Sequence, residues 1–293
     1  MNRTRLNLLL AVMVAALAGG AYWAQQAKNK PKDTLTPLAA EGVERMLIDW
    51  PGSPRIELAR QNGNWFLKQP VEARADRFEA VGATSLASTE VQERIEGADV
   101  DLKELGLAPP SHTITLNDVV LEFGGSDPLQ SRRYVRVGGV VKLIDEPATA
   151  ALDRDYADLV SKALFGPGDE LVKIELPTFT LSKDDKGEWS APAGTPHATP
   201  AALKALADGW KDVQAMWNEA ATDAADATGD VVRITLKDGR VQEYRVAATD
   251  PQLALYAPAL KVRHQLSKAL AETLLQLPDP KAVVPTAASE PVS

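Results

Sequence analysis

Apolar and polar residues alternate in short runs along most of the chain, and the runs are interrupted by turn residues. Three runs have a turn pair at their centre: Ile56 to Leu67 around Asn62-Gly63, Thr113 to Phe123 around Asn117-Asp118, and Tyr134 to Ile144 around Gly138-Gly139. Alternation of this kind is typical of half-buried strands, and these pairs favour tight hairpins. The pattern therefore predicts antiparallel sheets with one face exposed to solvent.

Other segments carry apolar residues at helical spacing, and we expect these helices to cover the second face of the sheets. One begins at Asp76, with Phe78, Val81, Gly82 and Leu86 on its apolar face; one is capped by Thr199 and Pro200, with Leu203, Leu206, Trp210, Val213 and Trp217; two closing helices are marked by Leu152, Tyr156, Leu159 and Ala163, and by Leu266, Leu270, Leu274 and Leu277. Stripes of this composition are more often core than ligand platform.

The chain also repeats itself. Gly63-Asn64-Trp65 is matched by Gly187-Glu188-Trp189 at an offset of 124 residues, the segment 114–118 by 234–238 at an offset of 120, and Tyr134 by Tyr256 at an offset of 122. Matched blocks in the same order at nearly equal offsets predict two repeats of ordinary domain size.

Leu6 to Ala24 is an uncharged, mainly apolar run of 19 residues that follows Arg3 and Arg5. A helix of that length rises about 28 Å, which is close to the hydrocarbon thickness of a bilayer. The small residues at 16–18 leave cleavage by a signal peptidase open, but Tyr22 and Trp23 favour an uncleaved anchor with an interfacial aromatic belt. The prediction is a single-pass membrane protein with a cytoplasmic N-terminus and an exported body.

The expected fold class is therefore α+β: an N-terminal transmembrane helix followed by two tandem repeats, each an antiparallel sheet of hairpins packed on one face by helices. The expected parts are a signal anchor over 1–27, a linker over 28–40, a first repeat over 41–167, a second repeat over 168–277 and a disordered tail over 278–293.

Charge separates the leader from the body. The chain has 32 basic and 40 acidic residues, and the first 32 residues hold five basic groups and no acid, so the remainder has 27 basic and 40 acidic residues and a net charge of −13. Such a body is repelled by nucleic-acid phosphates and by anionic bilayer surfaces. The cluster Arg132, Arg133 and Arg136 is interpreted as a solvated strand edge rather than a phosphate site.

No catalytic, cofactor-binding or metal-binding residues are predicted, and the expectation is that the protein is not an enzyme and needs no cofactor. The chain has no cysteine, and its histidines, His112, His197 and His264, lie 85 and 67 residues apart with no ligand at zinc-site spacing. The acidic groups at 99–101 and 153–158 lack the glycine and glutamate of a calcium loop. Gly124-Gly125-Ser126-Asp127 is not a nucleophile elbow, and phosphate-binding glycine loops are missing from the sequence.

A series of motifs resembles one bacterial family. The series comprises Asn62 to Pro70, Ala75-Asp76 before the helix, Glu104 to Pro110, and Tyr134-Val135-Arg136 with Gly138 and Val141 to Ile144. It resembles a domain of unknown function that occurs in single-span exported proteins, often as tandem copies. The resemblance implies an association with ABC-type exporter components of the kind linked to gliding motility, and it supplies no catalytic residues.

The favoured function is a non-catalytic, membrane-anchored periplasmic accessory protein. Its expected partners are the inner membrane, through residues 6–24, and the permease or auxiliary subunits of an exporter or envelope complex, with no nucleic acid. The alternative is a periplasmic binding module for a small ligand or an envelope polymer, which predicts a deep pocket between the repeats. A hydrolase is the least favoured reading, since it requires the distant histidines and acids to converge.

Overall fold

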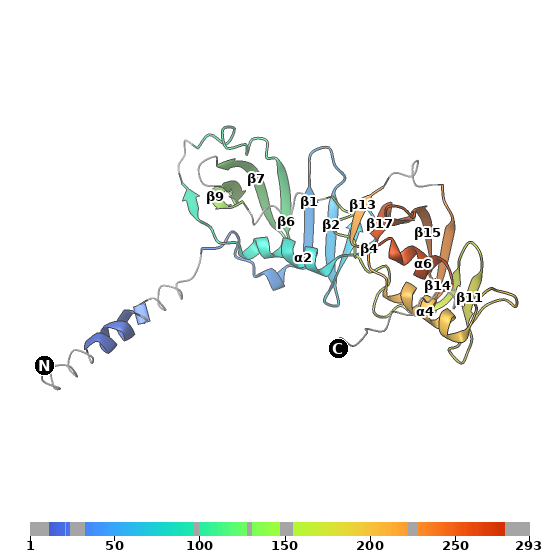
Figure 1. The fold of residues 1–293 in the computed structure, drawn as a ribbon. Coiled ribbons are helices and arrows are strands. Elements are labelled where there is room, and N and C mark those ends of the chain that lie inside the picture. The colour runs from blue at the N-terminus through green and yellow to red at the C-terminus, as the bar shows by residue number, and fades with distance from the viewer. Residues whose placement is uncertain are drawn as a thin grey trace, which may run out of the picture.

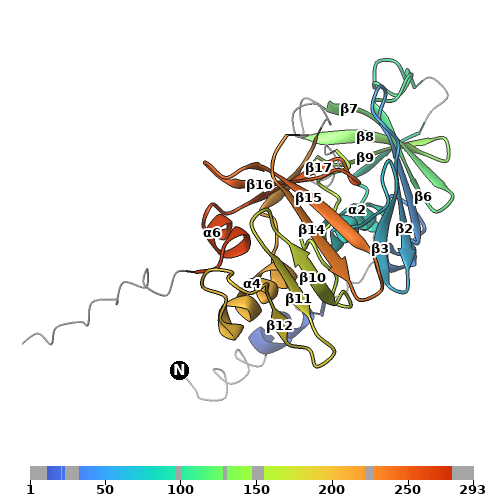
Figure 2. The ribbon, with the colours of Figure 1, turned by 90° about the vertical axis from the view of Figure 1, so that its right-hand side faces the viewer.

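The computed structural model describes residues 12–20, 22–23, 33–96, 100–127, 131–146, 155–221 and 228–278. The body consists of two antiparallel sheets, of nine and eight strands. In Figure 1 the first sheet is blue to green and the second is yellow to red, and Figure 2 shows the second sheet from its own side. Short helices lie against each sheet.

The first sheet has the order β4-β3-β2-β1-β6-β7-β8-β9-β5. Its strands are β1 (Arg45–Asp49), β2 (Ile56–Gln61), β3 (Asn64–Gln69), β4 (Ala73–Arg74), β5 (Glu93–Ile95), β6 (His112–Leu116), β7 (Val119–Asp127), β8 (Arg132–Val137) and β9 (Val140–Asp145). Its short helices are η1 (Ala40–Gly42), α2 (Arg77–Thr84) and η2 (Ser85–Ser88).

The second sheet has the order β12-β11-β10-β14-β15-β16-β17-β13. Its strands are β10 (Leu171–Glu175), β11 (Thr180–Lys183), β12 (Trp189–Ser190), β13 (Trp217–Ala220), β14 (Val231–Leu236), β15 (Val241–Ala248), β16 (Leu253–Ala257) and β17 (Val262–Leu266). Its helices are α4 (Pro200–Asp212) and α6 (Ala269–Leu275).

The two sheets follow one plan. If the edge strand β4 is left aside, the orders correspond strand for strand: β3 with β12, β2 with β11, β1 with β10, β6 with β14, β7 with β15, β8 with β16, β9 with β17 and β5 with β13. Each repeated block of the sequence falls on a corresponding pair of elements. Trp65 lies in β3 and Trp189 in β12, and Tyr134 and Tyr256 lie in β8 and β16.

The predicted antiparallel hairpins are confirmed, and their turns have the backbone that the sequence requires. Asn62 and Gly63 have φ values of 50° and 79° between β2 and β3, and Gly138 and Gly139 have 57° and 85° between β8 and β9. Two consecutive positive φ values match the twist of the flanking strands, and glycine and asparagine adopt them at the lowest cost.

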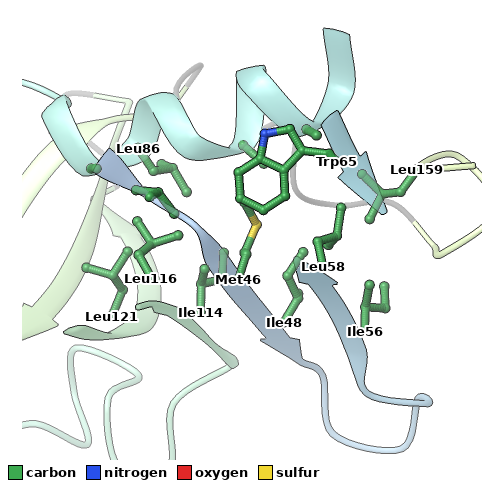
Figure 3. Close-up of a cluster of buried hydrophobic side chains, with 14 of the residues drawn as sticks. Met46, Ile48, Ile56, Leu58, Trp65, Leu86, Ile114, Leu116, Leu121 and Leu159 are labelled. Atoms are coloured by element: carbon green, nitrogen blue, oxygen red, sulfur yellow. The ribbon is translucent and has the colours of Figure 1, made fainter. Parts of the chain in front are cut away.

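The core of the first sheet lies between its covered face and the helical layer. Trp65 in β3 and Met46 in β1 are buried there, and their side chains point toward one another beside Leu58 (Figure 3). β3 ends at Gln69, directly before Pro70, as expected for a residue that lacks the amide donor. Trp65 therefore anchors its strand to the core.

The helix starts are confirmed, but the buried faces are only partly as predicted. Asp76 caps α2 by accepting hydrogen bonds from the Phe78 and Glu79 amides, and Thr199 caps α4. In α4 the predicted Leu203, Leu206 and Trp210 are buried, although the helix ends at Asp212 and Trp217 belongs to β13. In α2 the buried residues are instead Ala80, Ala83 and Thr84.

The predicted α+β class is wrong, because the structure is mostly two antiparallel sheets with few and short helices. The closing helix expected around Tyr156, Leu159 and Ala163 does not form: residues 156–159 are a turn, and Val160 and Ala163 make isolated bridges to other segments. In residues 160–163, backbone pairing with both sheets takes the place of helical hydrogen bonds. Leu152 lies outside the described residues.

The predicted transmembrane helix over residues 6–24 is also corrected. Residues 12–20 and 22–23 are helical. Among the described residues, no helix combines the length and the apolar character that crossing a membrane requires. Positions 6–11, 21 and 24 of the predicted span lie outside the described residues.

The end of the predicted linker belongs to the first sheet. Leu35 and Thr36 are buried, and their amides donate to the Thr89 and Ala87 carbonyl oxygens at 2.8 and 3.1 Å. Lys142 in β9 donates to the Leu35 carbonyl oxygen at 2.8 Å, and its own burial lowers its pKa. The packed body therefore begins near residue 33, whereas residues 279–293 of the predicted tail lie outside the described residues.

Candidate functional site

The structure places the histidines in three separate environments. His112 in β6 is buried, with its ring between Trp50 and Phe123 at centroid distances of 3.8 and 4.4 Å, and its Nδ1 is 3.1 Å from the Ser111 hydroxyl. His264 is buried in β17 of the other sheet, and His197 lies in the loop before α4. Within the described ranges, no three or more histidine or acidic side chains gather where they could hold a metal ion.

The acidic groups serve as turn caps where they are described. Asp101 accepts a hydrogen bond from the Lys103 amide at 2.8 Å, and Asp155 accepts one from the Ala157 amide at 2.6 Å. Asp99, Asp153 and Arg154 lie outside the described residues. These carboxylates stabilise local turns.

The arginine cluster is neutralised by carboxylates, and β8 is an interior strand rather than the expected edge. Each of the three arginines forms an ion pair: Arg132 with Asp145 at 3.7 Å, Arg133 with Glu146 at 2.5 Å and Arg136 with Glu122 at 2.6 Å. The Glu122 side chain raises the pKa of Arg136, chiefly through this hydrogen bond. Paired guanidinium groups of this kind are not available to a phosphate.

An extended connector over residues 159–164 joins the two sheets. It runs between β4 of the first sheet and the segment that precedes β13 of the second. Its backbone hydrogen bonds are Asp76 N to Leu159 O at 2.8 Å, Ser161 N to Arg74 O at 2.9 Å, Ala215 N to Lys162 O at 2.8 Å and Leu164 N to Val213 O at 3.4 Å. Because the connector pairs with both sides, it fixes the two sheets to one another.

Buried side chains reinforce this junction. Asn218 in β13 donates from Nδ2 to the Val160 carbonyl oxygen at 2.8 Å, and its Oδ1 is 2.8 Å from His264 Nδ1. Since Oδ1 can only accept, Nδ1 of His264 carries the hydrogen. Burial lowers the pKa of His264 to about 4, so the ring is neutral at physiological pH.

The apolar cores also meet at the junction. Val262 in β17 belongs to the core of the first sheet, and Leu260 packs against both cores. The hydroxyl of Tyr156, just before the connector, donates to the Lys261 carbonyl oxygen at 2.7 Å. The junction is therefore packed and hydrogen-bonded rather than flat and solvated.

A cavity of about 430 Å³ opens beside this junction. It is lined by the turn between β1 and β2, the start of β2, the segment just before the connector and the end of β13. The lining residues are Trp50, Ser53, Pro54, Ile56, Asp155, Tyr156 and Ala220. Trp50 is the outer ring of the stack with His112 and Phe123, which are both buried, so its position is fixed. The lining is mainly apolar, with the hydroxyls of Ser53 and Tyr156 and the carboxylate of Asp155 as its polar groups, which suits a small neutral or cationic ligand.

A second cavity of about 460 Å³ lies at the far end of the second sheet. Its lining consists of Thr178, Phe179, Ala193, Gly194, Thr195, Pro196, His197, Gln276 and Leu277. His197 has a positive φ of 60°, which places it in a tight turn of the loop that precedes α4. The residues that line this cavity include no acidic side chain.

The most unusual surface is the outer side of α2. Phe78 is 83% exposed and Val81 is 51% exposed, although both lie in a regular helix. The sequence predicts these residues to face the core, so their role at the surface was missed. The sequence does contain a second stripe of small apolar residues, Ala80 and Ala83, and this stripe packs on the sheet. It could have indicated that Phe78 and Val81 face outward.

The comparison with family models decides the family. A model of the domain of unknown function DUF4340 matches residues 65–258. The chain belongs to this family. The DUF4340 match runs as one stretch from Trp65 in β3 to the turn after β16, so it includes elements of both sheets and the connector between them. No curated protein and no solved structure matches the chain.

Proposed function

We propose that this DUF4340 protein is a non-catalytic interaction module that serves as an accessory subunit of an ABC-type exporter or a related envelope complex. The observation that carries the proposal is the exposed apolar stripe of α2, on a body whose two sheets are fixed to one another. Apolar side chains exposed on a regular element mark interaction surfaces when they form a patch. The exporter association and the periplasmic location remain predictions from the sequence and the family resemblance.

The chemistry of the described residues supports a role without catalysis. His112 and His264 are buried in separate sheets. Arg133 and Arg136 are ion-paired with Glu146 and Glu122. A hydrolase would need a nucleophile, a base and an orienting group within hydrogen-bond reach. The Ser111 hydroxyl lies 3.1 Å from His112 Nδ1, but it donates to the Phe123 carbonyl oxygen at 2.9 Å, and the ring beside it is buried.

Co-purification tests the proposal. The tagged full chain is extracted in mild detergent at its native expression level, beside a Phe78→Asp variant and a Val241→Asp control, since Val241 is also exposed, at 57%, but lies in β15. We expect the unmodified chain and the control to retain a permease or auxiliary subunit in fixed ratio, and Phe78→Asp to lose it. Recovery of the unmodified chain as a lone monomer would contradict the proposal.

The cavity beside the junction supports a second candidate function, a binding module for a small ligand. The rigid Trp50 platform and the Asp155 carboxylate suit a neutral or cationic molecule with an apolar face. Ligand-observed NMR with short oligosaccharides and organic amines tests it. Binding that Trp50→Leu abolishes would support this function, and binding that this substitution leaves unchanged would exclude the cavity as its site.

A further inference from the structure

The outer face of α2 has a regular shape. Phe78, Val81, Gly82 and Ser85 follow one another at positions i, i+3, i+4 and i+7, so they form one stripe along the helix and its 3₁₀ extension η2. Figure 1 shows α2 lying across the first sheet, toward β4 and β13. Phe78, Val81, Gly82 and Ser85 are all exposed, so the stripe lies on the side of the helix away from the sheet.

The fold does not require an apolar stripe at this place. The inner face of α2 is already satisfied by Ala80, Ala83 and Thr84, and its start is capped by Asp76. Gly82 is disfavoured in the middle of a helix, yet a Cβ added there would meet nothing within 4 Å among the described residues. Gly82 therefore leaves a notch, and the exposed Phe78 forms a knob beside it. A second helix can pack closely on a surface of this shape.

Charge decides among the possible occupants. The body beyond residue 32 has a net charge of −13, so a second copy of the chain and an anionic bilayer are both disfavoured by like charge. The groups beside the stripe keep that sign locally. Asp76 and Glu79 share one lysine, Lys162, at 3.8 and 3.6 Å. With Arg77 of α2 and Glu41 of the neighbouring η1, these groups are three acidic and two basic residues, so their formal charges sum to 2 − 3 = −1.

We infer that the outer face of α2 docks an amphipathic helix of a partner protein, whose apolar stripe packs over Phe78, Val81 and Gly82 and whose flanks carry lysine or arginine. This inference rests on the proposed function, since it names the surface and the partner chemistry of that interaction. Recognition of this type reads apolar anchors at i, i+3, i+4 and i+7, and opposite charge adds association rate and specificity.

Two synthetic helical peptides test the chemistry. They share one apolar stripe at this spacing and differ only in their flanks, which are lysine in one and glutamate in the other. In fluorescence anisotropy with the full chain, we expect the lysine peptide to bind at least tenfold more tightly than the glutamate peptide, and less tightly as salt is raised. Equal binding of the two peptides, or no binding of either, would overturn the inference.

Variants of the chain locate the site. Phe78→Ser removes the knob and Gly82→Leu fills the notch. We expect each substitution to lower the affinity for the lysine peptide at least tenfold. Both positions are exposed, so neither variant should lower the melting temperature, and Gly82→Leu should raise it because glycine is disfavoured within a helix. Lost binding is thereby separated from lost folding. Val241→Ser, a matched exposed apolar position on β15, should bind as the unmodified chain does. Unchanged binding by Phe78→Ser would place the site elsewhere.

A photo-crosslinking residue at position 81 identifies the natural occupant. We expect it to capture a basic amphipathic segment of another protein, read by peptide sequencing. Capture of the same chain, of lipid or of an acidic segment, or no capture above the level at position 241, would overturn the inference. If the complex still co-purifies in that case, the proposed function stands and only the surface is wrong; if nothing co-purifies, the function itself fails.

Discussion

Burial determines the protonation state of His264, because its hydrogen-bond partner Asn218 carries no charge that would stabilise the protonated ring. The ring is enclosed at the junction, and its hydrogen bond from Nδ1 goes to a neutral amide, that of Asn218. The folded state therefore favours neutral imidazole, whereas the unfolded state takes up a proton near the ordinary pKa of about 6.5. The histidine thus acts as a structural residue that responds to acid.

Acid should destabilise the protein through this histidine. The pKa of His264 is lowered to about 4 in the folded state, so the unfolded state binds a proton more readily. The resulting loss of unfolding free energy is absent above about pH 6.5 and grows as the pH falls toward 4. Between about pH 7 and pH 5, we expect the free energy of unfolding to fall about 2 kcal/mol more in the unmodified protein than in His264→Gln. Urea titrations at both pH values measure this, and parallel pH dependence of the two proteins would contradict it.

Gly124 and Gly125 form a second residue-scale feature, because a loop crosses the sheet over them. The Gly125 amide donates to the Leu105 carbonyl oxygen at 2.8 Å. A Cβ on Gly124 would collide with that same oxygen and lie 2.9 Å from Leu107 Cγ, whereas a Cβ on Gly125 would find its nearest neighbour at 3.6 Å. The pair that fails as a catalytic motif is therefore a packing motif.

Gly124→Ala should lower the free energy of unfolding by about 1–3 kcal/mol, because the loop backbone must shift. Gly125→Ala is the matched control, and we expect it to change stability by less than about 0.5 kcal/mol. Chemical denaturation of the two variants measures the difference. Equal losses would mean that the loop does not approach the strand as described.

At the scale of elements, the sequence predicted what local chemistry controls. The hairpin turns at Asn62-Gly63 and Gly138-Gly139 and the caps Asp76 and Thr199 were correct, because each depends on neighbours in the chain. The predicted buried face of α2 was wrong because hydrophobicity favours Phe78, whereas the residues that α2 buries are Ala80, Ala83 and Thr84.

Long-range pairing explains the other errors. Leu35 sits in a polar, proline-containing segment but pairs with residues more than 50 positions away. The connector after Tyr156 resembles a helix in its spacing, yet it is held extended by partners from both sheets. The junction cavity was expected only in outline, since residues near 50, 155 and 220 line it and no local pattern relates them.

Two substitutions test the face of α2. Leu86 is buried beside the helix, so Leu86→Ala should cost about 2–5 kcal/mol of unfolding free energy. Phe78→Ala should cost less than about 0.5 kcal/mol, because the ring loses almost no packing. If Phe78 and Leu86 shared one buried face, as the sequence pattern predicts, both substitutions would cause large losses of stability. Thermal and urea unfolding therefore distinguish that face from the one seen in the structure.

At the scale of the whole molecule, the connector makes two sheets of one plan into a single body. It contributes backbone hydrogen bonds to each side, and Asn218 ties it to His264 within the second sheet. A partner that engages α2 is therefore mechanically linked to the cavity and to the second sheet. A rigid connection of this kind is what the proposed interaction module requires.

The junction should make unfolding cooperative across both sheets. We expect a single urea transition for the unmodified body, and Asn218→Ala should lower its stability by about 1–3 kcal/mol, because the Val160 carbonyl oxygen and His264 Nδ1 lose their partner in a buried place. Asn64→Ala, on the exposed surface of β3, should change stability by less than about 0.5 kcal/mol. Two separate transitions in the unmodified protein would show that the sheets fold independently.

Native mass spectrometry of the full chain, extracted at its native expression level, tests the central claim most directly. The account predicts a defined assembly in which the chain is bound to exporter or envelope subunits, and it predicts that Phe78→Asp releases the chain while Val241→Asp does not. A chain that appears alone in all three preparations, at unchanged stability, would contradict the interaction role.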